Sequence, residues 1–203
     1  MTANGVGPHA GAMDTSLLRL YQRQVAAQCF AAILASETAQ NAAKRAAHPP
    51  GVPTIPDGSG TREPPPQDVF WANIGNFLTA ATNIARTCWG QSGIYRKERK
   101  PLRKSLGIKG DSPLKQMAMR NDFEHVDEWT AKWYATSANH MHVDGMVGPA
   151  AVIEGVSDAD MFRVFDTTTS EVVFWGTRYP LKSLVDEIGR IYPIATAEAD
   201  TPL

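Results

Sequence analysis

The chain has little cysteine and no long apolar run, and these two shortages exclude whole classes of protein. Only Cys29 and Cys88 are cysteines among 203 residues, which excludes a disulfide-stapled secreted domain, and we expect two reduced thiols in a core. No apolar run reaches membrane-spanning length. The N-terminus lacks the basic and apolar regions of a secretory signal. We therefore expect a cytoplasmic protein that makes no contact with a membrane.

Neither sign of charge dominates the sequence. Lysine and arginine total 20, aspartate and glutamate total 21, and the net charge is −1 at pH 7. This balance argues against a surface coated in basic charge for nonspecific nucleic-acid binding, but it allows a local basic patch. The chain is long enough, and apolar enough, for one good-sized domain or for one domain with an appendage.

The first half of the sequence predicts two long helices. One covers residues 14–47, begins at a cap formed by Asp14 or Thr15, and is rich in alanine, a strong helix former. The other covers residues 67–88, where apolar residues recur at three- and four-residue steps. Residues 48–66, between the two helices, are crowded with proline and glycine and predict a connector. The apolar face of the second helix comprises Phe70, Ile74, Phe77, Ala81, Ile84 and Cys88.

A further long helix is expected over residues 112–135, where Ser-Pro makes a good helix start. At about 100° per residue, one stripe of this helix comprises Met119, Phe123, Val126, Thr130 and Trp133, and the opposite face comprises Asn121, His125, Glu128 and Lys132. His125 is therefore expected to point away from the packing stripe. We interpret Trp129 and Trp133 as core or interface aromatics rather than as platforms for base stacking.

The pattern becomes strand-like in the last third of the chain. Short strands are expected at residues 150–154, 161–165 and 171–175, and the last two form a hairpin. A short amphipathic helix is expected after Pro180. Residues 195–203 should be a frayed tail.

Together these elements predict a mainly α fold, or α+β when the whole chain is counted. We expect a flexible tail over residues 1–13, and a four-helix-type bundle over residues 14–136 that contains the proline-rich connector. Residues 137–194 should form a small antiparallel β-hairpin region with a short C-terminal helix, attached as an appendage.

The segment just before the third helix is strongly basic. It carries six cations, which are Arg96, Lys97, Arg99, Lys100, Arg103 and Lys104. One interpretation is a solvated helix with an excess of one sign of charge. The other is a patch that binds the phosphates of RNA.

The stretch from Met119 to Trp129 carries the strongest functional signal. Arg120, Asn121 and His125 lie here on a predicted long helix, after helices of bundle type. This arrangement resembles the HEPN superfamily of four-helix-bundle proteins, whose signature is an arginine, usually followed by a polar residue, and a histidine four to six positions further on. The string Arg-Asn-x-x-Glu-His-x-Asp-Glu, with Ser-Pro-Leu ahead of it, also resembles a group of bacterial HEPN-like proteins. The resemblance covers residues 67–136. It extends to residues 14–47 only because the helix expected there completes the number of helices in the family's bundle.

The resemblance implies metal-independent RNA cleavage by a homodimer of toxin or defence type, with an antitoxin or regulatory protein as a possible partner. A ribose 2′-hydroxyl would attack the adjacent phosphodiester and leave a 2′,3′-cyclic phosphate and a free 5′-hydroxyl. His125 would take or give a proton, and Arg120 would offer a planar fork to the phosphate. Asn121, one helical turn before His125, would orient the imidazole or hold a phosphate oxygen. No metal and no cofactor are expected.

Two alternatives remain open at the sequence level. Carboxylates crowd the motif and would repel RNA unless the basic segment compensates for them; they are Asp122, Glu124, Asp127 and Glu128. They could instead pair with Arg120 and make a noncatalytic dimeric interaction module, with the charged helix as its interface. Separately, His140, His142 and Asp144 alternate along the chain and could bind a metal, although an exposed loop is the simpler interpretation.

Overall fold

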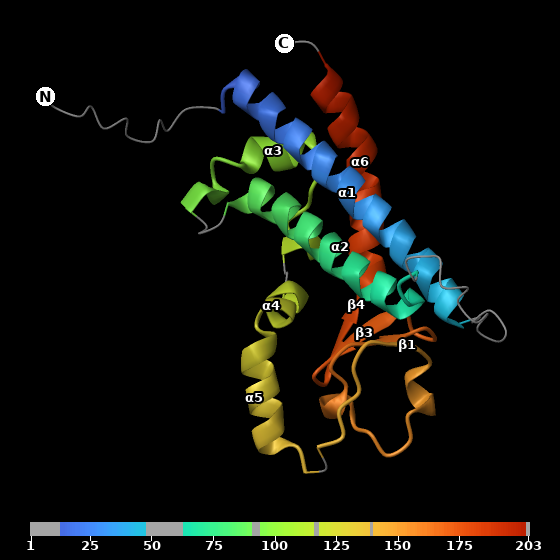
Figure 1. The fold of residues 1–203 in the computed structure, drawn as a ribbon. Helices are drawn as coiled ribbons and strands as arrows, with labels where there is room; N and C mark the ends of the chain where they lie inside the picture. Colours follow the sequence, from blue (N-terminus) through green and yellow to red (C-terminus); the bar gives the residue numbers. More distant parts are fainter. Residues whose placement is uncertain (1–12, 48–62, 91–93, 116–117, 139, 202–203) are drawn as a thin grey trace, which may run out of the picture.

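Three long helices and the short helix α3 lie in one half of the molecule, and a small sheet with the short helices α4 and α5 lies in the other (Figure 1). The computed structural model describes residues 13–47, 63–90, 94–115, 118–138 and 140–201. The helices are α1 (Thr15–Ala47), α2 (Pro66–Trp89), α3 (Lys100–Ser105), α4 (Ala118–Glu124), α5 (Val126–Thr136) and α6 (Leu181–Asp200). The strands are β1 (Met146–Gly148), β2 (Val164–Asp166), β3 (Glu171–Phe174) and β4 (Thr177–Pro180). Short 3₁₀ turns lie at Ile94–Arg96, Pro113–Lys115, Ala150–Val152 and Asp158–Asp160.

This architecture confirms a mainly α fold with a small β region and a C-terminal helix. Almost all of the expected N-terminal tail and most of the proline-rich connector lie outside the described residues. Within the described ranges, no helix combines the length and the apolarity needed to cross a bilayer.

The two long N-terminal helices follow the sequence pattern closely. The Asp14 carboxylate accepts a hydrogen bond from the backbone N–H of Ser16 at 2.8 Å and so caps α1. The six apolar residues predicted on one face of α2 are all buried, as are Val25 and Cys29 of α1. Burial raises the pKa of both cysteine thiols to about 12, so they stay protonated and inert.

The C-terminal helix is longer than expected. Residues 195–203 were expected to fray, but α6 continues through Pro193 to Asp200 and packs along α1. Ala195 and Ala199 are buried there, so packing offsets the hydrogen bond that a proline inside a helix removes. The prediction of a frayed tail is therefore wrong as far as Asp200, because it took no account of a tertiary partner.

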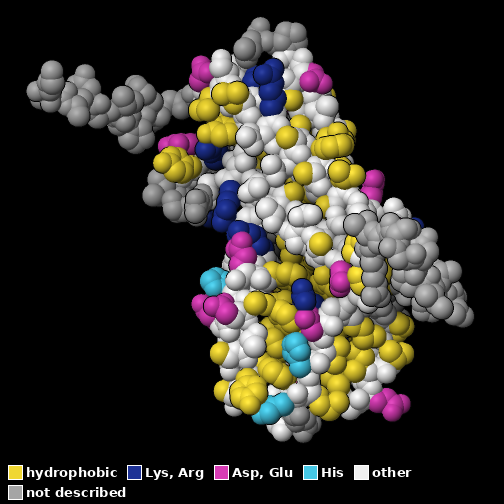
Figure 2. Space-filling view, viewed as in Figure 1, with side chains coloured by type: hydrophobic (Ala, Val, Ile, Leu, Met, Phe, Trp, Pro, Cys, Tyr) yellow, Lys and Arg dark blue, Asp and Glu magenta, His cyan; other side chains and the backbone are white. Residues whose placement is uncertain are grey.

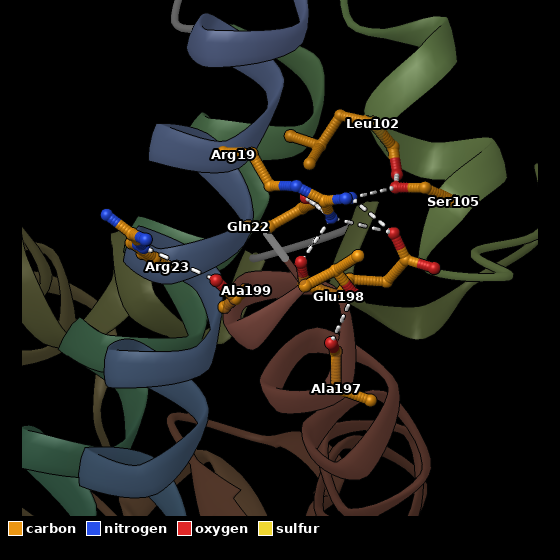
Figure 3. Close-up of polar contacts among 9 residues, drawn as sticks. Arg19, Gln22, Arg23, Leu102, Ser105, Ala197, Glu198 and Ala199 are labelled. Carbon is orange, nitrogen blue, oxygen red and sulfur yellow. Dashed lines mark hydrogen bonds and ion pairs between the residues drawn. The ribbon is translucent and has the colours of Figure 1, made fainter. Parts of the chain in front are cut away.

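A polar network fixes this end of α6 against α1 and α3 (Figure 3). The Gln22 amide is fully buried and donates to Ser105 Oγ and to Glu198 Oε2, each at 3.0 Å. Arg19 Nη1 donates to Gln22 Oε1 at 3.0 Å and pairs with the Glu198 carboxylate at 3.2 Å. The network satisfies a buried polar side chain and connects three helices that are far apart in sequence.

The helix expected over residues 112–135 is divided. A 3₁₀ turn covers Pro113–Lys115, and α4 and α5 follow with His125 between them at φ −100° and ψ 38°. The break re-aims the second segment: Phe123 stacks on Phe174 at 4.8 Å, but beyond the break Trp129 turns toward the core and Val126 is 36% exposed. A continuous helix would have kept Val126 on the packing stripe and placed Trp129 about 80° away from it.

The sheet has the strand order β1-β2-β3-β4. The expected hairpin is confirmed as antiparallel pairing of β2 with β3, although β2 begins at Val164 rather than at Met161. The strand expected at residues 150–154 is wrong. That segment is a 3₁₀ turn, which follows Pro149 and is closed by the Ile153 N–H donating to the Ala150 carbonyl. β1 instead lies just before it and runs parallel to β2.

The edge strand β4 was not predicted, because its sequence Thr-Arg-Tyr-Pro is polar and ends in proline. Both features suit an edge strand, which has a free side. Side chains of the sheet, including Val172 and Phe174, join the same buried cluster as α1, α2 and α6. The region expected as an appendage therefore shares its core with the long helices.

Candidate functional site at the α4–α5 junction

The residues of the candidate motif lie on α4 and at its end, but they face different surroundings. The Arg120 side chain is only 16% exposed and pairs with the Glu124 carboxylate one turn later in the same helix. Its Nε is buried and has no acceptor among the described residues. Asn121 is exposed, and its carbonyl accepts a hydrogen bond from the His125 N–H at 3.0 Å.

His125 is directed toward solvent. Its side chain is 57% exposed, and Nδ1 lies 3.3 Å from the Glu128 carboxylate, which is 74% exposed. The residue belongs to neither helix, and the backbone hydrogen bonds on both sides of it are kept. The expectation that this imidazole leaves the packing face is confirmed, and the kink is what places it at a corner of the molecule.

The rim of the junction is acidic. Glu124, Asp127 and Glu128 are exposed. Asp122 instead accepts a hydrogen bond from the Tyr179 hydroxyl of β4, which ties α4 to the sheet. Burial and this carboxylate raise the pKa of Tyr179, so the phenol remains a donor. One carboxylate of the motif is therefore structural, one neutralises Arg120, and the other two, Asp127 and Glu128, are exposed, with Glu128 beside His125.

The basic segment lies on a different part of the fold. It forms the 3₁₀ turn before α3 and α3 itself, and these pack on α1 and α2, whereas α4 packs on α2 and α5. Two of its arginines serve the fold. Arg99 lies over the Tyr21 ring at 3.5 Å, and Arg103 donates to the carbonyl of Cys88 at 2.6 Å. Burial lowers the pKa of both guanidinium groups.

The other four cations of the segment are exposed; they are Arg96, Lys97, Lys100 and Lys104. In Figure 2 the lysines and arginines are found mainly over the long helices, whereas the histidines lie on the half with the sheet. The structure therefore leaves Arg120 partly buried against Glu124 and His125 exposed beside Glu128, and it leaves the predicted RNA-binding cations on separate elements.

The alternative metal site does not form. Asp144 receives two hydrogen bonds from Arg163, at 2.6 and 2.7 Å, while His140 stacks on Tyr134 and His142 lies beside Trp133. Among the described residues, no group of three histidine, cysteine, aspartate or glutamate side chains is placed to hold a metal ion.

The sequence analysis interpreted Trp133 as a core or interface aromatic and missed the group of residues that gathers around it on the far part of α5. Trp133 donates through Nε1 to Asp160 Oδ1 at 2.9 Å, and its ring lies 5.5 Å from that of Trp175. The Trp-Gly pair between β3 and β4 was a local turn signal that could have separated two strands. Nothing in the sequence marked Asp160.

Comparison with known proteins assigns this chain to no family, so its function has to be inferred from its residues. No family model, no curated protein and no solved structure matches this chain.

Proposed function

We propose that the chain is a HEPN-like, metal-independent endoribonuclease of toxin or defence type, acting in the cytoplasm as a homodimer. The observation that carries the proposal is the exposed His125 at the α4–α5 corner, with Asn121 one helical turn before it and Arg120 five residues before it. An imidazole open to solvent and a guanidinium five residues before it in the chain supply the chemistry that 2′-hydroxyl attack on a phosphodiester requires.

In this mechanism His125 accepts the proton of the ribose 2′-hydroxyl as the 2′-oxygen bonds to phosphorus. The bond from phosphorus to the 5′-oxygen breaks, leaving a 2′,3′-cyclic phosphate. The departing 5′-oxygen takes a proton from the imidazolium of the second copy. Arg120 stabilises the phosphate charge that grows in the transition state. One corner carries a single imidazole, so a second copy completes the acid–base pair.

Arg120 must exchange its carboxylate partner for a phosphate. Pairs of this spacing on a helix surface contribute roughly 0.2–0.5 kcal/mol, and Glu124 is 49% exposed. A doubly hydrogen-bonded phosphate can therefore displace Glu124 at low cost.

The test is incubation of the purified protein with mixed RNA in the presence of a chelator, followed by end-group analysis. We expect products with 2′,3′-cyclic phosphate and 5′-hydroxyl ends. His125→Ala and Arg120→Ala should each reduce cleavage by about a hundredfold or more, the contribution typical of general acid–base catalysis. Arg45→Ala removes an exposed arginine that pairs with Glu63 near the end of α1, away from the corner, and is the matched control. Unchanged cleavage by both corner variants would remove the catalytic assignment.

The acidic rim favours one second candidate, a noncatalytic dimeric interaction module. Arg120 is already paired with Glu124, and Asp127 and Glu128 remain exposed. In this case the carboxylates of one copy would pair with cations of another copy or of a regulatory protein. Arg120→Glu should then dissociate the dimer in sedimentation experiments while His125→Ala leaves it intact, and no variant would affect RNA.

A further inference from the structure

A pocket with tryptophan walls lies at the far part of α5. It is open on one side, has a volume of about 430 Å³ and is lined by α5 with the two residues after it, by residues 155–160 and by the turn between β3 and β4. Its main side chains are Trp129, Lys132, Trp133, Ser137, Asp160 and Trp175. None of the motif residues at the α4–α5 corner lines it.

Two residues around this pocket are held in a strained backbone conformation. Trp175 has φ 47° and precedes Gly176 at φ 82°, in a two-residue hairpin turn whose first position normally takes asparagine, aspartate or glycine. His140 has φ 49°. Both rings converge on Trp133, at 5.5 and 6.1 Å. Bulky side chains persist in left-handed conformations where the surroundings dictate them, and such positions cluster at ligand sites.

The pocket carries two charged side chains, Asp160 and Lys132, and hydrogen bonds hold Asp160 in place. The Asp160 carboxylate accepts hydrogen bonds from Ser157 Oγ at 2.7 Å, from Trp133 Nε1 at 2.9 Å and from Ser137 Oγ at 2.8 Å. These bonds lower the pKa of Asp160, which therefore stays ionised. Two of the three bonds go to Oδ1, so Oδ2 keeps a lone pair for a further donor. Lys132 lies at the pocket, with its ammonium 4.6 Å from the Trp129 ring.

We propose that this pocket binds a base of single-stranded nucleic acid. The base stacks on the tryptophan rings, its exocyclic amino group donates to Asp160, and Lys132 binds the adjoining phosphate. The proposal rests on the proposed function in one respect, namely that the strand is the RNA bound at His125. Trp133 lies eight positions after His125, which corresponds to about 12 Å along the helix axis.

A cationic ligand suits the pocket less well than a base does. Aromatic cages surround a quaternary ammonium with ring faces. Here Trp133 and Trp175 lean on each other at 32°, and the Lys132 ammonium already lies over Trp129. A second cation would meet this ammonium. The Nε1 of Trp175 is buried without an acceptor among the described residues, and a base, unlike a quaternary ammonium, carries acceptor atoms.

The test uses the full chain and a single-stranded 2′-deoxy oligonucleotide, which cannot be cleaved by 2′-hydroxyl attack. Binding is measured by quenching of tryptophan fluorescence and by anisotropy of a labelled strand. Trp129→Leu and Lys132→Ala should each weaken binding, Trp129→Leu by about tenfold or more, as is typical when a stacking ring is removed. Tyr134→Leu is the matched control, because this exposed aromatic residue lies on the same helix and does not line the pocket. Circular dichroism checks the fold of each variant.

The outcomes separate this proposal from the ribonuclease proposal. Binding by wild type and by His125→Ala, with loss in both pocket variants, supports the pocket whether or not RNA is cleaved. Absence of binding to wild type, or equal binding by wild type and both pocket variants, overturns it. Displacement of the oligonucleotide by millimolar tetramethylammonium chloride, but not by the same concentration of sodium chloride, would also overturn it in favour of a cation site. Loss of cleavage in His125→Ala tests the corner alone.

Discussion

The long-helix half of the molecule and the α4–α5 half are stabilised in different ways. In the first half, α1 alone buries nine residues, five of which are alanines that allow close contact with α2 and α6. In the second half, α5 has no fully buried residue. It is attached through partly buried rings and through the hydrogen bonds of Asp160. The first half should therefore unfold as a unit, whereas α5 should be able to loosen while the rest stays folded.

Among the predicted changes, a cavity in the helical half should lower the free energy of unfolding most. Phe77 is 2% exposed in the centre of α2. Phe77→Ala should lower the free energy of unfolding by about 3–5 kcal/mol, because it removes buried apolar area and leaves a void. Chemical denaturation measures the loss. Phe30→Ala is the control: Phe30 is 55% exposed on α1, and its change should be about 0.5 kcal/mol or less. Similar losses for both variants would mean that this half has no continuous core.

Removal of the Asp160 carboxylate should affect the second half selectively. Asp160→Ala leaves Trp133 Nε1, Ser137 Oγ and Ser157 Oγ without their acceptor. We expect a loss of about 1–3 kcal/mol, the usual range when hydrogen-bond partners are left unsatisfied. Amide hydrogen exchange should show faster exchange in α5 and unchanged protection in α1 and α2. Uniform loss of protection across the chain would contradict the division into two halves.

Acid should loosen the second half through the same residue. Hydrogen bonds from Ser157, Trp133 and Ser137 lower the pKa of Asp160. The stabilisation is therefore present above the unfolded pKa of about 3.9 and is lost as pH falls through the lower folded value. Near-ultraviolet circular dichroism of the tryptophans should change below about pH 4 in wild type. Asp160→Asn removes this titration and should reduce the change; an identical acid profile would show that Asp160 does not control it.

The contrast also explains how far the sequence predicts this fold. The long helices and the β2–β3 hairpin follow from periodicity, which is a local property. The kink at His125 does not, because it depends on where Phe123 and Trp129 find partners, and both partners lie elsewhere in the chain. The extension of α6 past Pro193 could not be predicted either, because it depends on packing against α1.

The same reasoning applies to the candidate site. Outward placement of His125 was predictable from helical angles alone. Pairing of Arg120 with Glu124 was compatible with their spacing, but the spacing could not decide between this partner and a phosphate. The pocket around Trp133 and Trp175 was hidden because its residues come from three separated segments.

The smallest expected effect on stability concerns the polar contacts at the end of α6, inside the helical half. Glu198→Ala removes the carboxylate that joins Arg19 and Gln22 at the end of α6. The Glu198 side chain is 40% exposed, so we expect a loss of about 1 kcal/mol or less. Yet Gln22 is fully buried and would keep only Ser105 as an acceptor for its amide. Hydrogen exchange near Ala195 should accelerate while α2 stays protected. Glu198→Gln keeps an acceptor and should restore most of the protection; failure to do so would mean that charge, rather than hydrogen bonding, fixes the end of α6.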